Sequence, residues 1–370
     1  MKIAYLSHLD LNLYLFRLPI MKELVNMGNE VFAICPEGEF FEKFYDYNIT
    51  PISYKIKRES LNPFNEISTI QSIKKILQDI NPDILHTFMH KPNIYGNFSG
   101  AKNIINTVTG LGSFFIHNDL KSKFVRSIIE NLYKYSTKNA KKVIFQNSDD
   151  LNYFVNKKII PKDKAILIKS SGVDTDFFQP QPKNEKLLKE LNIKSSKPIV
   201  LMIARVIRDK GVLEYIKAAE ILKDKATFLY VGNIDKGNKN AFNPDFKNVK
   251  YLGFRKDIKD IISIADIVVL PSYREGTPRT LLEAGAMGKP LITTNAPGCK
   301  EVVKDGYNGF LVPVKDSKIL AEKIKILIED KNLRKKFGYN SREYIKKEFD
   351  VKIVVKKYLE LYNNVLKAYV

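Results

Sequence analysis

Short runs of β-branched and other apolar residues alternate with helical patterns along this chain, and that alternation restricts its fold more than any other feature. Strand patterns lie at residues 2–7 and 30–35, and a helical pattern at 14–27 lies between them and is ended by Gly28. Further strand patterns occupy residues 81–86, 102–108 and 142–146, and a further helical pattern occupies 67–80. Strands and helices that alternate in this way form a parallel sheet with helices on both faces.

A second series of strand patterns begins after residue 197. These patterns cover residues 198–204, 226–231, 249–252, 264–270 and 290–294. Residues 171–197 between the two series are polar and contain prolines, which is typical of a linker. The sequence therefore predicts an α/β protein with two doubly wound, Rossmann-like domains, residues 1–170 and 198–350, and with amphipathic helices toward its C-terminal end.

The length and composition suit a globular enzyme. A chain of 370 residues with 44% hydrophobic residues can build two domains, each with its own core. No apolar run reaches the roughly 20 residues of a membrane-spanning helix. The first residues form a strand and not a signal peptide, so we expect a cytoplasmic address. Cys35 and Cys299 have no metal-ligand spacing and are expected to be reduced thiols.

The formal net charge of +20 indicates an anionic partner. No nucleic-acid-binding motif accompanies the lysines, so we expect no nucleic-acid partner. One basic segment also carries apolar residues; it contains Lys121, Lys123, Phe124, Val125, Arg126, Ile128, Ile129, Leu132, Tyr133, Lys134, Lys138, Lys141 and Lys142. Such a segment either lies on an anionic membrane surface through its apolar face or packs as an ordinary surface helix, and the sequence leaves both open.

Residues 270–284 join a strand, a sharp turn and a helix. Gly276 and Pro278 favour the turn, and the helical pattern begins near Thr280. Glu275 lies on the turn and Glu283 on the helix. Backbone N–H groups at a helix start favour a phosphate, and two nearby carboxylates suit the hydroxyls of a sugar and a ribose. The alternative is a pair of solvated surface carboxylates, which are common.

Two cations follow the first strand of the second domain. Arg205 and Lys210 are expected at the carboxyl edge of the sheet, where α/β proteins bind ligands. Fixed positive charge there would neutralise a leaving diphosphate, although two ordinary surface cations remain the alternative. The sequence Asp174-Thr175-Asp176 resembles a metal-binding motif, but in a loop it is expected to cap a turn and not to bind Mg²⁺. No metal or other cofactor is predicted.

The two glutamates separated by seven residues, the preceding Leu-Pro-Ser and the following Gly-Lys-Pro-Leu-Ile-Thr-Thr resemble the donor signature of the family 4 retaining glycosyltransferases. The resemblance implies a GT-B fold, in which a final helix, here 351–370, packs back on the first domain. It also implies that Glu283 holds the ribose, Glu275 contacts the transferred sugar, and Arg205 with Lys210 binds the diphosphate. The other implied nucleotide-sugar contacts are Gly232, Phe254, Arg255, Gly276, Thr277, Pro278, Arg279, Thr280 and Leu281.

Residues near strand ends in the first domain are predicted to bind the acceptor. They are His8, Asn12, Arg17, His90, Lys91, Thr109 and Gly110. Arg17, His90 and Lys91 suit a diphosphate, because charge-assisted bonds favour such a group. Many relatives have Gly-Gly where this chain has Leu11-Asn12, and a histidine where it has Thr109. His90 and His117 are the alternatives for that missing histidine.

Further motifs resemble one branch of this family, which extends lipid-linked oligosaccharides for bacterial N-glycosylation. The motifs are Ser7-His8, Phe16-Arg17-Leu18-Pro19-Ile20, Ser60-Leu61-Asn62-Pro63-Phe64, His90-Lys91-Pro92-Asn93, Gly110-Leu111-Gly112-Ser113-Phe114 and Met202-Ile203-Ala204-Arg205. The branch implies transfer of GalNAc from UDP-GalNAc, with an alpha-1,3 linkage, to undecaprenyl-diphosphate-linked N,N'-diacetylbacillosamine. It places the enzyme peripherally on the cytoplasmic face of the cell membrane, beside other enzymes of the pathway.

Three alternatives stay open. One is a related enzyme that transfers GlcNAc or a hexose from a UDP-sugar to another lipid-linked acceptor in capsule or lipopolysaccharide synthesis. Another is a UDP-sugar 2-epimerase of the same fold. The last is a non-enzymatic polyanion-binding protein, which predicts salt-dependent binding without affinity for UDP.

Overall fold

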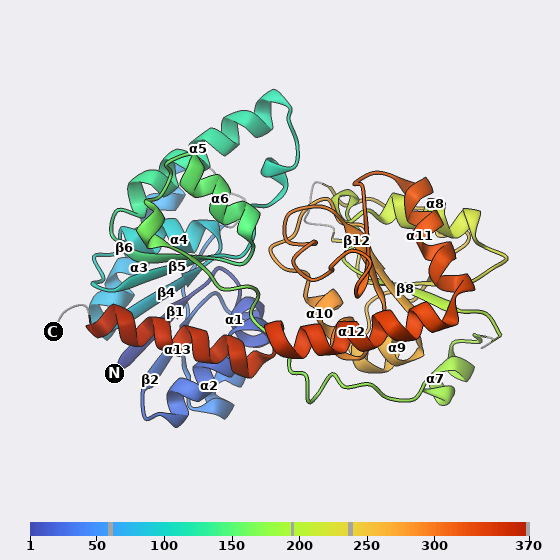
Figure 1. The fold of residues 1–370 in the computed structure, drawn as a ribbon. Helices are drawn as coiled ribbons and strands as arrows, with labels where there is room; N and C mark the ends of the chain where they lie inside the picture. Colours follow the sequence, from blue (N-terminus) through green and yellow to red (C-terminus); the bar gives the residue numbers. More distant parts are fainter. Residues whose placement is uncertain (58–61, 194–195, 236–239, 368–370) are drawn as a thin grey trace. The chain divides into compact units, whose positions relative to one another are not determined.

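The computed structural model describes residues 1–57, 62–193, 196–235 and 240–367, and the chain folds into two compact units (Figure 1). Unit 1 comprises Met1–Gly172 and Val351–Val370, and unit 2 comprises Val173–Asp350. Part of the motif Ser60-Leu61-Asn62-Pro63-Phe64 lies outside the described residues. The residues at 171–197, predicted as a linker, lie almost entirely in unit 2, because Leu187 and Leu188 pack in its core.

Unit 1 is built on a seven-stranded parallel sheet with the order β3-β2-β1-β4-β5-β6-β7. The strands are β1 (Lys2–Leu6), β2 (Glu30–Ile34), β3 (Thr50–Ile52), β4 (Ile84–Phe88), β5 (Ile104–Val108), β6 (Ala140–Phe145) and β7 (Ala165–Leu167). The five longer strands confirm the sequence patterns. The patterns missed β3 and β7, which have three residues each and are too short to show a period.

Helices cover both faces of this sheet. The helices are α1 (Asp10–Phe16), α2 (Leu18–Asn26), α3 (Pro63–Ile80), α4 (His90–Asn97), α5 (Leu120–Ser136), α6 (Ser148–Asn156) and α13 (Val351–Lys367). Alternate residues of β1 point to opposite faces: Tyr5 packs with α1, α2 and α13, whereas Leu6 packs with α3 and α4. α13 therefore completes one face of unit 1, which confirms the predicted return of the final helix.

The helix predicted at residues 14–27 is in fact two helices. α1 ends and α2 begins at Arg17, whose backbone is not helical (φ −122°). Pro19 lies in the first turn of α2 and removes a backbone N–H that a continuous helix would need. The break lets the chain turn between the end of β1 and the face of the sheet.

Unit 2 has a six-stranded parallel sheet with the order β10-β9-β8-β11-β12-β13. The strands are β8 (Ile199–Ile203), β9 (Thr227–Val231), β10 (Lys250–Tyr251), β11 (Ile267–Leu270), β12 (Leu291–Thr294) and β13 (Gly309–Val312). The prediction missed β13 and began β11 too early, because Ile264 is the last residue of α9. The helices are α7 (Glu185–Glu190), α8 (Val212–Ile221), α9 (Ile258–Ile264), α10 (Arg279–Ala286), α11 (Ser317–Glu329) and α12 (Lys331–Phe349).

The central strands of unit 1 carry polar side chains inside the core. His86 on β4 is fully buried; one ring nitrogen lies 2.7 Å from the Thr107 hydroxyl of β5, and the other contacts the Tyr362 hydroxyl of α13. The hydroxyls of Tyr362 and Tyr5 are 2.8 Å apart. Burial lowers the pKa of His86 well below its usual value, with a smaller effect from the nearby Arg17 cation, so the ring is neutral.

A second buried network lies on the opposite face of the same strands. The Asn106 amide of β5 donates to the Thr87 hydroxyl of β4 at 2.7 Å, and that hydroxyl donates to Asn93 Oδ1 of α4 at 2.7 Å. Asn97 Nδ2 of α4 donates to Asn106 Oδ1 at 2.9 Å. These bonds hold α4 in one position over the sheet.

The chain passes between the units twice, and the two crossing points are adjacent. Val173 forms a parallel bridge with Asp350, and its N–H donates to Phe349 O at 2.9 Å. Gly172 has φ +81°, and a Cβ there would lie 2.7 Å from Val351 Cα, so only glycine fits. Within the following loop, Asp174 Oδ1 accepts bonds from the backbone N–H groups of Asp176 and Phe177, which confirms the predicted turn cap.

Candidate functional site

The predicted donor residues follow neighbouring strands of unit 2. Gly232 comes after β9, Arg205 after β8, and Glu275 after β11, and these strands are adjacent in the sheet. Because parallel strands end at the same edge, the structure brings the loops that carry these residues together at the carboxyl edge of the sheet. This is the edge at which α/β folds bind ligands.

Two glycines allow the loops at this edge to approach each other closely. Gly211 has φ +73°, and a Cβ there would lie 2.1 Å from Pro271 O. Gly232 has φ +150°, and a Cβ there would lie 1.7 Å from Ala204 O. A side chain at either position would collide with backbone, so both loops depend on glycine.

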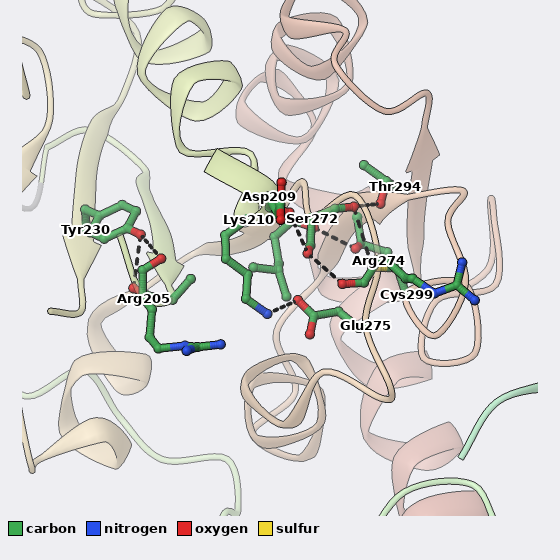
Figure 2. Close-up of polar contacts among 12 residues, drawn as sticks. Arg205, Asp209, Lys210, Tyr230, Ser272, Arg274, Glu275, Thr294 and Cys299 are labelled. Atoms are coloured by element: carbon green, nitrogen blue, oxygen red, sulfur yellow. Dashed lines mark hydrogen bonds and ion pairs between the residues drawn. The ribbon is translucent and has the colours of Figure 1, made fainter. Parts of the chain in front are cut away.

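Lys210 and Glu275 form an ion pair at the centre of the site (Figure 2). Lys210 ends a short 3-10 turn, Arg208–Lys210, and Glu275 lies in the loop after β11. Both side chains are largely buried. Coulombic attraction between such partly buried charges is screened less by water than at the surface, so the pair holds both side chains in place.

Backbone and hydroxyl groups clamp the two loops that carry this pair. The carbonyl of Asp209, next to Lys210, accepts bonds from the N–H of Tyr273 at 2.8 Å and from the hydroxyl of Ser272 at 3.1 Å. The N–H of Glu275 donates to Pro297 O at 3.0 Å. Sequence patterns do not indicate this clamp, because its acceptors are backbone carbonyls.

Two further side chains bond to the loop that carries Glu275. The carbonyl of Ser272 accepts a bond from the Thr294 hydroxyl, and the Cys299 thiol lies 3.8 Å from it (Figure 2). Burial is the main reason that the pKa of Cys299 rises to about 12, and the nearby Glu275 charge adds to it. The thiol therefore stays protonated and serves the structure.

Arg205 lies at the same edge but pairs with a different carboxylate. Its Nη1 is 2.6 Å from Asp235 Oδ2, and its side chain is 58% exposed. Each of the two predicted diphosphate cations, Arg205 and Lys210, thus has its own carboxylate partner. Asp235 was missed in the sequence, although its position just after β9 and Gly232 places it at the ligand edge. Also missed was Glu214 of α8, which accepts a bond of 2.9 Å from the Tyr273 hydroxyl.

Glu283 lies in α10, which begins directly after Pro278. Its Oε1 accepts a bond of 2.9 Å from Arg279 Nε, one helical turn earlier. Burial raises the pKa of Glu283, and the Arg279 charge opposes this effect. A desolvated carboxylate of this kind gains from accepting further hydrogen bonds, such as those from hydroxyl groups.

The remaining predicted donor residues have varied surroundings. The Thr277 hydroxyl donates to Gly276 O at 2.9 Å, and Thr280 is half-buried in the first turn of α10. Phe254 is exposed, and Arg255 donates two bonds to Asp257 at 2.8 and 2.6 Å. The Leu281 side chain is fully buried in the core of unit 2, so the predicted contact of Leu281 with a ligand is limited to its backbone.

The predicted acceptor residues also follow adjacent strands, here in unit 1. His8 and Asn12 come after β1, His90 and Lys91 after β4, and Thr109 and Gly110 after β5. They therefore share the carboxyl edge of the first sheet. Asn12 is buried, and its Oδ1 lies 3.5 Å from the Ser7 hydroxyl.

Arg17 is buried beside the carboxyl end of β4. Only 2% of the residue is exposed, and its guanidinium lies 4.5 Å from the centroid of the Phe88 ring. This cation–π contact compensates in part for the loss of water around the charge. The contact of Arg17 with an acceptor stays a prediction, and it would require the ligand to reach this buried guanidinium.

His90 is held by two bonds. Its Nε2 donates to Leu111 O at 3.2 Å, and its Nδ1 accepts from the Tyr133 hydroxyl of α5 at 3.0 Å. Burial lowers the pKa of His90, so the ring is neutral. With both nitrogens engaged, His90 is poorly placed to replace the histidine that many relatives carry. The preceding Met89 has φ +74°, an unusual value for a side-chain-bearing residue.

Lys91 has carboxylate and carbonyl partners. Its ammonium lies 2.9 Å from Glu66 Oε1 and 3.0 Å from Lys57 O.

Within the described parts of the chain, no three His, Cys, Asp or Glu side chains gather as metal ligands do. No helix among those same residues is long and apolar enough to cross a membrane.

Comparison with known proteins identifies similar sequences and folds. A family model described as glycosyl transferases group 1 matches residues 183–344, and one described as glycosyl transferase 4-like matches residues 2–147. The N,N'-diacetylbacillosaminyl-diphospho-undecaprenol alpha-1,3-N-acetylgalactosaminyltransferase of Campylobacter jejuni is 38% identical over 99% of this chain and 100% of its own. The UDP-Gal:alpha-D-GlcNAc-diphosphoundecaprenol alpha-1,3-galactosyltransferase of Escherichia coli is 26% identical over 92% of each chain.

A solved structure has a similar fold. Anabaena Alr3699/HepE in complex with UDP is 20% identical to this chain, with a TM-score of 0.82 over 98% of this chain and 100% of the other. At that level of identity the likeness concerns the fold alone. It agrees with the two parallel-sheet units described above.

Proposed function

The chain belongs to the family 4 glycosyltransferases and has their GT-B fold, and on this premise we propose that it transfers GalNAc from UDP-GalNAc to undecaprenyl-diphosphate-linked N,N'-diacetylbacillosamine. The observation that carries the proposal is the 38% identity, over nearly the whole chain, to the Campylobacter enzyme of that activity. The new linkage would be alpha-1,3, with the anomeric configuration retained. Because the acceptor is a lipid, the reaction would take place at the cell membrane, and we propose the cytoplasmic face.

Unit 2 supplies the donor site in this proposal. Arg205 and Lys210 would bind the two phosphates of UDP, because both are cations at the carboxyl edge of the sheet. Glu283 would accept bonds from the ribose hydroxyls, which would compensate for its burial. Glu275 would contact hydroxyls of the sugar, since Lys210 already holds it in the centre of the site.

The ion pair of Lys210 and Glu275 would change its partners when the donor binds. Before the donor binds, Glu275 balances Lys210. A diphosphate would share the ammonium and leave the Glu275 carboxylate able to accept bonds from sugar hydroxyls. Lys210 and Glu275 would thus orient the diphosphate and the sugar of the donor together.

The acceptor hydroxyl would attack the donor sugar on the same face from which UDP leaves. The bond between the anomeric carbon and the β-phosphate oxygen breaks, and the acceptor hydroxyl oxygen forms the new bond to that carbon. A phosphate oxygen takes the hydroxyl proton, so no protein base is needed. Arg205 and Lys210 would offset the charge that develops on the diphosphate. We propose on this basis that the reaction needs no metal ion.

Unit 1 would bind the acceptor. The segments that follow β1, β4 and β5 carry Asn12, Lys91 and Thr109 at one edge of the sheet. Lys91 would contact the acceptor diphosphate by exchanging its Glu66 partner for phosphate oxygens. Alanine at Lys91 would then raise KM for the acceptor more than KM for the donor.

The test is an assay with the bacillosamine-linked polyprenyl diphosphate and separate UDP-sugars: UDP-GalNAc, UDP-GlcNAc, UDP-galactose and UDP-glucose. UDP release and product mass are recorded with and without EDTA. The expected result is a disaccharide lipid from UDP-GalNAc alone, unchanged by EDTA. Product from UDP-galactose only would favour an activity like that of the Escherichia coli relative and would refute the proposed donor. Activity that EDTA abolishes and Mg²⁺ restores would refute the metal-free mechanism.

A further inference from the structure

One helix of unit 1 exposes a continuous apolar stripe. On α5, large apolar side chains recur at Leu120, Phe124, Ile128, Leu132 and Tyr135. Spacings of four and three residues place them on one face of the helix. Leu120 is 85% exposed, Phe124 69% and Tyr135 64%, so the stripe faces away from the core of unit 1.

The opposite face of α5 has its partners inside the unit. Tyr133 is fully buried, accepts a bond from Asn93 Nδ2 of α4 at 3.1 Å, and packs edge-on against Phe154 of α6. Its hydroxyl also bonds to His90 of α4. The buried face therefore anchors α5, and the apolar stripe is not needed for that anchoring.

Basic side chains border the stripe. Lys121, Lys123, Lys134 and Lys138 are exposed on or just after the helix, and the Lys138 ammonium lies 5.1 Å from the centroid of the Tyr135 ring. The acidic residues of α5 and its N-cap form bonds within the unit. Asp119 caps the helix by accepting bonds from the N–H and the hydroxyl of Ser122. Glu130 accepts bonds from Tyr153 and Lys157. An exposed apolar face beside lysines, with Glu130 paired to Lys157, is complementary to an anionic lipid surface.

We infer that the α5 stripe docks this protein on an anionic bilayer. Leu120, Phe124 and Ile128 enter the boundary between headgroups and acyl chains, and the bordering lysines contact lipid phosphates. The inference rests on the proposed function, whose acceptor is anchored in the membrane. The inference goes beyond that function because it names the surface of the protein that faces the lipid.

This docking surface is joined directly to the acceptor edge. Tyr133 on the inner face of α5 holds His90, and Lys91 follows His90 in α4. Docking through the outer face would place α4 one helix layer from the bilayer. A diphosphate at the lipid surface would then lie near the residues predicted to bind it, whereas its polyprenyl chain would stay in the membrane.

The test is co-sedimentation of the full chain with vesicles of equimolar phosphatidylethanolamine and phosphatidylglycerol. One variant carries Leu120→Ser, Phe124→Ser and Ile128→Ser. The matched control carries Ile221→Ser and Tyr339→Ser, which remove two exposed apolar side chains from unit 2. We expect the stripe variant to lower the vesicle partition coefficient at least about tenfold and the control to leave it unchanged.

Charge and lipid composition give a second arm. Lys123→Glu with Lys134→Glu should weaken binding to the anionic vesicles, and added salt should reduce the difference. Replacing the anionic lipid by phosphatidylcholine should also weaken binding of the wild type. Equal binding of the wild type and the stripe variant would overturn the inference. So would a wild-type dimer that ignores vesicles and dissociates in the stripe variant, because the stripe would then bind a second copy.

The assay also separates this inference from the proposed function. With a short-chain, water-soluble acceptor, the stripe variant should transfer sugar at the wild-type rate, and with acceptor in vesicles it should be slower. Sugar transfer without vesicle binding would refute the docking surface and keep the enzyme activity. Vesicle binding through the stripe without transfer to any acceptor would refute the activity and keep the docking surface.

Discussion

The two units place their polar side chains differently. In unit 1, His86, Thr87, Asn106 and Thr107 lie inside the central strands and are fully buried. In unit 2, the central strands β8 and β11 contain only apolar residues, and the charged groups lie in the loops after these strands. Unit 1 thus uses hydrogen bonds to fix its core, whereas unit 2 uses ion pairs at its edge.

This difference separates stability from chemistry. A buried hydrogen-bond network loses its value when one member is removed, because the remaining groups stay unpaired. The Arg205–Asp235 pair is partly exposed and contributes little to stability, and the Lys210–Glu275 pair joins two side chains at the ligand edge, so these residues can exchange partners when a ligand arrives. We therefore expect substitutions in the unit 2 site to affect rate first, and substitutions in the unit 1 network to affect folding first.

The largest expected effect is on catalysis in unit 2. Glu275→Ala or Lys210→Ala should lower kcat by about 10² to 10³, because each removes a group that acts on developing charge or orients the sugar. The measurement is UDP release at saturating donor and acceptor. The thermal midpoint serves as the control for folding. A variant with a near-normal kcat would contradict the role of its residue and weaken the contrast between the units.

The second prediction concerns the core of unit 1. Asn106→Leu keeps the branched shape of the side chain but leaves Asn97 and Thr87 without their Asn106 partners. The free energy of unfolding should fall by roughly 2 to 4 kcal/mol, measured by urea unfolding. The matched change in unit 2, Met202→Leu on β8, should cost less than about 1.5 kcal/mol. Equal losses would show that both cores depend on packing alone.

The third prediction concerns pH. The pKa of His86 is lowered in the folded protein, so its contribution to stability is present above about pH 6.5, the unfolded value, and is lost as pH falls. Tyr5, Tyr362, Thr107 and the Arg17 cation surround it, and none offers a negative charge for an imidazolium. Below that pH the loss should approach about 1.4 kcal/mol per pH unit. His86→Gln should remove this slope; an unchanged slope would assign it to other groups.

The smallest effect is expected at Glu283, with the opposite sign. Its pKa is raised in the folded protein, so unit 2 is favoured at low pH and loses that contribution as pH rises through the folded value. Glu283→Gln should therefore gain stability relative to the wild type at pH 8 and not at pH 4. KM for UDP-GalNAc should rise roughly tenfold, because a charged acceptor is lost. A stability difference independent of pH would refute the burial effect.

Sequence patterns were sufficient for the architecture and for the ligand edge of each sheet. Strands such as β1 and β8 are runs of β-branched and apolar residues, and parallel strands must end at a common edge. The patterns failed where contacts distant in sequence determine the local structure. β3 and β7 are too short for a period, and β13 begins at a glycine, which disfavours a strand. The pairing of Arg205 with Asp235 depends on how two loops meet.

Position within an element was equally hard to predict. Arg17 was predicted to bind the acceptor diphosphate from its place near a strand end, yet the break between α1 and α2 leaves its side chain buried against Phe88. Leu281 was predicted in the donor site from its place in a motif, yet its side chain fills the core. Spacing identifies which loop meets the ligand, but it does not say which atoms of that loop do so.

The return of α13 to unit 1 also affects how the protein is made. The ribosome releases all of unit 2 before it releases Val354, Tyr358 and Tyr362, which complete one face of the unit 1 core. Until then, the nascent chain exposes the apolar surface of α2 and lacks the hydroxyl that contacts His86. Unit 2 can therefore complete its core before unit 1 does, whereas N-terminal domains usually fold first.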